Sequence, residues 1–144
     1  MQKFHFSLEK ILGWRRTELQ AAEAGLAPLV AERTGLEAAR HEIAMGRARA
    51  DRDLLQGASV DGSELEALAR YRLRIENQKS AIERDLAGCR ERTARQSALI
   101  IEAHRRLRLL EKLKERRLAE WHVLWEREME TFASEAFLAR WKPP

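Results

Sequence analysis

Residues 68–89 read LARYRLRIENQKSAIERDLAGC, and the apolar spacing of this stretch decides the fold. Leu68, Ile75, Ile82 and Cys89 recur every seven residues, with polar and charged side chains between them. A seven-residue repeat keeps one apolar stripe of an α-helix facing a partner helix, which is the pattern of a coiled coil. The stretch therefore predicts a long helix that buries a single stripe.

The same spacing extends in both directions and is interrupted once, by the turn-forming cluster at residues 57–63. One interruption predicts two helices folded back on each other. The expected fold is therefore all-α, a long antiparallel two-helix coiled-coil hairpin whose second helix is the longer. The seam residues expected to face the partner helix are Leu12, Leu19, Leu26, Leu36, Ile43, Leu68, Ile75, Ile82, Cys89, Ile100, Leu107 and Leu110.

Capping chemistry places the expected helix boundaries. Ser7 is a good N-cap residue, so the first helix is expected over about residues 7–56. Ser63, with Glu66 three residues later, matches a capping box, so the second helix is expected over about residues 64–140 after a loop at 57–63. We expect one coiled-coil domain over residues 1–144.

Pairing across the expected loop places residue n near residue 120 − n, so the last thirty or so residues have no partner within the chain. Gly25 and Pro28 fall inside the first expected helix. An internal Pro removes a backbone donor and crowds the preceding turn. Because the apolar pattern continues on both sides, we expect a kinked helix, with a true break into three helices as the alternative.

Composition agrees with long solvated helices. The chain of 144 residues is 44% hydrophobic and 35% charged, with 6% aromatic residues and one Cys. A thick globular core needs more aromatic and β-branched residues. A single Cys excludes an internal disulfide, and 18 consecutive apolar residues occur nowhere, so we expect a cytoplasmic protein.

Charge and aromatic residues are unevenly placed. Residues 70–117 carry 15 basic and 7 acidic side chains, although the whole chain is only +4. This basic segment fits an acidic protein surface better than nucleic acid, because it has no stacking aromatics except Tyr71. The other aromatic residues lie near the termini, where they either anchor a partner or pack on one another; they are Phe4, Phe6, Trp14, Trp121, Trp125, Phe132, Phe137 and Trp141.

Residues typical of catalysis or metal binding are scattered. The four His side chains have no i, i+4 spacing and no nearby Cys, and no phosphate-binding glycine motif is present. Cys89 continues the seam, so we interpret it as a small core residue. The sequence therefore predicts a non-enzymatic protein without metal or cofactor.

Two short segments, Phe4–Lys10 and Glu111–Arg117 with Trp121 after it, resemble the FliJ family of flagellar type III export proteins. The first is an aromatic–x–aromatic opening that runs into Leu-Glu-Lys, formed by Phe4, Phe6, Leu8, Glu9 and Lys10. The second lies near the C-terminal end of the basic segment and is formed by Glu111, Lys112, Leu113, Lys114, Glu115, Arg117 and Trp121. A departure from the family pattern is the number of Trp residues after residue 120.

The resemblance implies a stalk or adaptor of the export apparatus, active in flagellum biogenesis and hence in chemotaxis. Its implied partners are the hexameric flagellar export ATPase, the membrane export gate protein and export chaperones, at a cytoplasmic site peripheral to the inner membrane. The second segment is then expected to meet the ATPase ring. Three other functions remain: the equivalent stalk of a virulence-type secretion system, a generic coiled-coil scaffold, and a basic rod that binds nucleic acid.

Overall fold

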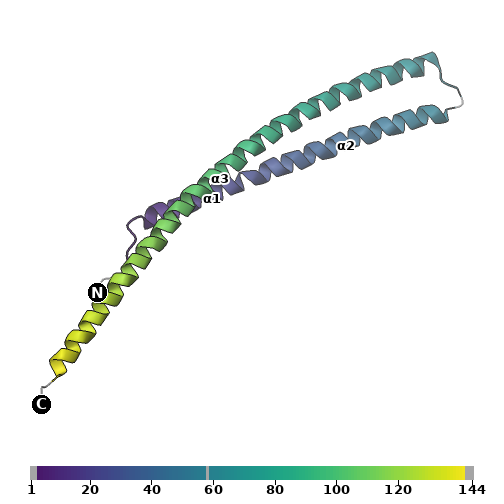
Figure 1. Ribbon diagram of the computed structural model, residues 1–144. Coiled ribbons are helices and arrows are strands. Elements are labelled where there is room, and N and C mark those ends of the chain that lie inside the picture. Colours follow the sequence, from purple (N-terminus) through teal and green to yellow (C-terminus); the bar gives the residue numbers. More distant parts are fainter. Residues whose placement is uncertain (1–2, 58, 142–144) are drawn as a thin grey trace. The chain divides into compact units, whose positions relative to one another are not determined.

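The computed structural model describes residues 3–57 and 59–141, which form helices and short connections without any strand (Figure 1). The helices are α1 (Glu9–Ala24), α2 (Leu26–Gln56) and α3 (Gly62–Arg140). The chain divides into two packed units. The terminal unit contains residues 3–21 and 100–141, and the central unit contains the described residues of 22–99.

Helix α3 takes part in both units, and in each it packs against an antiparallel partner. In the central unit α2 runs antiparallel to the first half of α3 across the connection at residues 57–61 (Figure 1). In the terminal unit α1 packs against the second half of α3. The prediction of an all-α antiparallel hairpin with a longer second helix is confirmed.

The expected seam is buried or half-buried at every predicted position. In the terminal unit Leu12 and Leu19 of α1 pack on Ala103 and Leu107 of α3. Ala103 was not predicted, although the spacing from Ile100 to Leu107 marks its position. In the central unit the most buried side chains are Ile75, Leu86 and Cys89 of α3. Burial of this stripe is the main stabilising term available to a helix pair.

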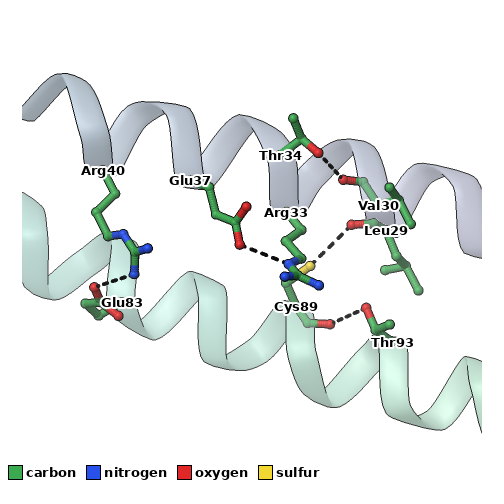
Figure 2. Close-up of polar contacts among 9 residues, drawn as sticks. All are labelled: Leu29, Val30, Arg33, Thr34, Glu37, Arg40, Glu83, Cys89 and Thr93. Atoms are coloured by element: carbon green, nitrogen blue, oxygen red, sulfur yellow. Dashed lines mark hydrogen bonds and ion pairs between the residues drawn. The ribbon is translucent and has the colours of Figure 1, made fainter.

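Cys89 occupies the core position predicted for it. Its side chain is fully buried, and its Sγ–H donates a hydrogen bond of 3.4 Å to the carbonyl of Leu29 (Figure 2). The carbonyl of Cys89 accepts a 2.8 Å bond from the Thr93 hydroxyl. The thiol therefore serves as a small packing group that also satisfies one backbone oxygen of α2.

Ion pairs fix the register of the two helices. In the central unit Arg40–Glu83, Arg47–Glu76 and Asp51–Arg72 each join residue numbers that add up to 123. In the terminal unit Glu9–Lys114 has the same sum. The expected value was 120, because the turn was centred on Ser59 and Val60. The observed pairing is therefore centred between residues 61 and 62, later in the chain than predicted.

The helix starts differ from the predicted caps. Helix α3 begins at Gly62, and Asp61 is its cap: the Asp61 N–H donates to Glu64 Oε2 at 3.2 Å, and Asp61 Oδ1 accepts from Gly62 N at 2.6 Å. The predicted box of Ser63 and Glu66 is wrong, because Asp61, two residues earlier, forms the cap together with Glu64. Ser63 donates its hydroxyl to Asp61 instead.

Helix α1 begins at Glu9 and not at Ser7. The Ser7 hydroxyl is engaged with α3, where it accepts a 3.3 Å hydrogen bond from Arg117 Nη1. The first turn is closed by backbone bonds instead, from Glu9 N to Phe6 O and from Leu12 N to Leu8 O.

The interruption at Gly25 is one residue long. Gly25 keeps a right-handed helical backbone, with φ −66° and ψ −15°. Pro28 lacks the N–H that would bond the carbonyl four residues back, so the helical ladder is weakened at this point. Gln96 of α3 donates to the carbonyl of Ala22 at 2.6 Å. The expected helix over residues 7–56 is thus split into α1 and α2, with a continuous helical course through Gly25.

The buried seam of the central unit predicts a large effect of truncation. Leu86→Ala should lower the free energy of unfolding by about 2–4 kcal/mol, because Leu86 is only 1% exposed and its loss leaves a cavity. Leu73→Ala, at a position 65% exposed on the same helix, should change it by less than about 0.5 kcal/mol. Urea denaturation followed by circular dichroism measures both. Equal losses would contradict the assigned face.

Gln96 and Gly25 should be energetically coupled. A Cβ added at Gly25 would lie 2.7 Å from Gln96 Nε2 and displace the side chain that bonds Ala22. Gly25→Ala alone should therefore give little or no stabilisation. In a Gln96→Ala background the same change should stabilise by up to about 1 kcal/mol, the ordinary Gly-to-Ala gain in a helix. A double-mutant cycle by thermal denaturation tests this coupling, and simple additivity would rule it out.

Candidate partner-binding site

The two segments that resemble the FliJ family meet in the terminal unit. Residues 4–9 lie along α3 between residues 114 and 121, more than a hundred residues later in the chain. The contacts include an ion pair, a hydrogen bond and an aromatic pair. The expected antiparallel pairing of the helices was the one signal in the sequence for this contact.

Lys114 is the centre of the polar contacts. Its Nζ lies 2.7 Å from Glu9 Oε2 and 2.9 Å from Glu9 Oε1. The same ammonium group lies 6.0 Å from the centre of the Phe6 ring, at the outer limit of a cation–π contact. Because Phe6 is only 3% exposed, Lys114 covers a buried ring and pairs with a carboxylate at once.

Two further motif residues contact α1 or the segment before it. Arg117 donates to Ser7, and Glu111 Oε1 lies 3.8 Å from Arg16 Nη2. Glu111 also lies near Arg108, at 3.7 Å. These motif charges therefore serve the internal helix pair.

The aromatic residues are only partly brought together. The rings of Phe4 and Trp121 are 6.1 Å apart at an interplanar angle of 58°, and Trp121 stacks on Trp125 at 6.5 Å. The suggested packing role is therefore present at Phe6, which closes the unit, while other rings stay exposed. The exposed ones are Trp14, Trp125, Phe132, Phe137 and Trp141.

Among the predicted ATPase-binding residues, Lys112 and Glu115 are exposed, and Leu113 is half-buried. Of the N-terminal motif, Lys10 is exposed and Leu8 is half-buried. An open groove next to these charges is lined by Leu12, Arg16, Glu111, Lys114, Glu115 and Leu118. The surface offered to a partner is thus a mixed-charge rim around a small apolar strip.

Much of the basic segment is engaged within the chain. Besides the pairs that set the register, Arg92 lies 2.6 Å from Glu32 and Arg106 lies 3.6 Å from Glu18. The hydrogen bond and the negative charge of Glu32 raise the pKa of the Arg92 guanidinium above its ordinary value. Arg40 and Arg47, which continue the register of Leu26 in place of apolar residues, reach across to α3 (Figure 2 shows Arg40).

A groove in the central unit was not predicted. It has an apolar lining from Ile43, Ala44, Ala48 and Ile75, and its other lining residues are Arg40, Arg47, Asp51 and Lys79. Small residues at positions 44 and 48 opposite Ile75 leave this space. The sequence signal that could have predicted this groove is the pair of Ala residues at i, i+4 spacing, Ala44 and Ala48.

Among the described residues, no cluster of three or more His, Cys, Asp and Glu side chains is arranged to hold a metal ion. None of the described helices has an apolar stretch sufficient to cross a membrane. Comparisons with protein-family models, curated proteins and solved structures give no match to this chain.

The buried ring of Phe6 should hold the N-terminal segment on α3. Phe6→Ala should cost about 3 kcal/mol, so amide hydrogen exchange in the first turn of α1 should accelerate by about a hundredfold. Ile11→Ala, at a position 44% exposed, is the control and should have a much smaller effect. Unchanged exchange in Phe6→Ala would mean that other contacts hold the segment.

Proposed function

We propose that the protein is a non-enzymatic coiled-coil stalk or adaptor of the flagellar type III export apparatus. In this role it inserts into the hexameric export ATPase, activates it, and links it to the membrane export gate and to export chaperones. The observation that carries the proposal is the packing of the N-terminal motif on the second motif. Phe4 meets Trp121, and Glu9 meets Lys114.

The two stretches that resemble one family form a single surface, and this contact supports the proposal. Their paired charges keep α1 and α3 in register, and Lys112 and Glu115 remain exposed beside them. Exposed charges of both signs orient a partner more than they bind it tightly. Such weak, orienting contacts suit a shaft that meets the unequal subunits of a ring in turn.

The family resemblance alone is the basis for three parts of the proposal: binding to the export gate, binding to chaperones, and location of the protein at the cytoplasmic side of the inner membrane. A virulence-type secretion stalk shares the helix-pair geometry, so it is the nearest alternative. A generic coiled-coil scaffold is the second alternative, and it is favoured by the exposed apolar side chains of α3 after residue 122. Nucleic-acid binding is less favoured, because several Arg side chains of the basic segment already pair with Glu or Asp.

The test is the turnover of the cognate export ATPase with and without the purified chain. The chain alone should hydrolyse no ATP, and it should raise the turnover of the ATPase. Lys112→Glu should raise the concentration needed for half-maximal activation by about three- to tenfold, as expected for a rim charge contributing about 1 kcal/mol. No change in turnover at saturating chain would refute the proposal.

Arg90→Glu is the matched control, because Arg90 is an exposed basic residue of α3 in the central unit. An equal loss from Arg90→Glu would mean that only the overall charge of the chain matters. Lys112 is a better probe than Lys114 or Arg117, since these two also hold the N-terminal segment.

A further inference from the structure

The face of α3 that packs on α1 continues beyond the end of its partner. From Ile100 through Leu107 and Leu110 to Trp121, the seam residues follow one another at steps of three and four residues. The same steps continue to Trp125, Met129, Phe132, Ala136 and Ala139. Because such steps keep residues on one side of a helix, these five side chains extend the same stripe. We call them the distal seam.

Burial changes abruptly along this stripe. Ala103 and Leu107 are buried, and Trp121 is half-buried against Phe4. Every residue from 122 to 141 is exposed, and Met129 and Phe132 reach 46% and 69% exposure. Large apolar side chains left in water at seam positions indicate an interface that the described part of the chain does not complete.

The charges beside the stripe change sign at the same place. Arg106, Arg117 and Glu128 follow one another at steps of eleven residues, or about three turns, so they lie on the same flank. Glu135 follows Glu128 after seven residues, on that flank as well. Against the Arg positions the chain itself supplies acceptors, with Glu18 at 3.6 Å from Arg106 and Ser7 at 3.3 Å from Arg117. Beyond Arg117 the same flank of α3 carries the carboxylates of Glu128 and Glu135. A helix that packs there would therefore need basic side chains opposite them.

We infer that the distal seam binds one amphipathic helix of a partner protein, with an apolar stripe and with Lys or Arg on its flanks. This helix would replace α1 as the packing partner of α3 over about five turns. A second copy of this chain fits poorly, since residues 120–141 carry five Glu and two Arg and would place like charges together. The inference rests on the terminal unit and does not depend on the proposed function.

The test uses two synthetic helical peptides of about 20 residues, enough to cover about 30 Å of helix. Both have Leu at steps of three and four residues; one has Lys at the flanking positions and the other has Glu. Fluorescence anisotropy of the labelled peptides should detect binding of the Lys peptide to the full chain and at least about tenfold weaker binding of the Glu peptide. Equal affinities, or no binding of either peptide, would overturn the inference.

Two variants of the full chain separate the seam from bulk charge. Phe132→Glu should lower the affinity of the chain for the Lys peptide by about tenfold or more. Phe137→Glu makes the same substitution at a residue 68% exposed but away from both the stripe and its acidic flank, so it should leave the affinity unchanged. Equal weakening by both variants would overturn the assigned face.

The double variant Glu128→Lys with Glu135→Lys should reverse the preference in favour of the Glu peptide. Sedimentation of the chain alone tests the competing occupant. A concentration-dependent dimer that Phe132→Glu abolishes would show that a second copy covers the distal seam. It would overturn the inference that a basic helix of a partner protein binds there. A monomer that binds the Lys peptide supports it.

Discussion

Burial of one apolar stripe on α3 is the constraint on which the other features depend. A helix pair has a single shared interface, so each seam residue contributes a large part of the total stability. In the terminal unit the stripe meets Leu12 and Leu19, and in the central unit it includes Leu86 and Cys89. The ion pairs lie beside this stripe, where they select the register while contributing little energy individually.

The central unit is packed less tightly on the α2 side. Helix α2 has no fully buried residue, and small side chains such as Ala44 and Ala48 face an apolar groove. Cross-helix pairs such as Arg47–Glu76 and Arg92–Glu32 flank this thin seam. Among the basic side chains of residues 70–117, Arg72, Arg92, Arg106 and Lys114 pair with carboxylates of α2 and α1.

The terminal unit combines a closed and an open section. Up to Trp121, α3 is covered by α1 and by the segment before it, and Lys114 and Phe6 seal the contact. Beyond Trp121 the same face is uncovered and its flank becomes acidic. The terminal unit thus presents exposed charges at residues 112 and 115 and exposed aromatic side chains farther along α3.

Sequence spacing was enough to predict the helices and their buried stripe, because a seven-residue apolar repeat places one face of a helix against a partner. The single interruption at residues 57–63 indicated that this partner lies within the chain. Leu12, Ile75 and Cys89 were predictable core residues for that reason, and Gly25 with Pro28 marked the weak point of the first helix. Which polar side chains form contacts within the chain depends on the three-dimensional packing of the helices. Asp61 displaced Ser63 as the cap, and Ser7, Lys114 and Arg117 became internal contacts. Such choices depend on distances between residues remote in sequence, which no local spacing can specify.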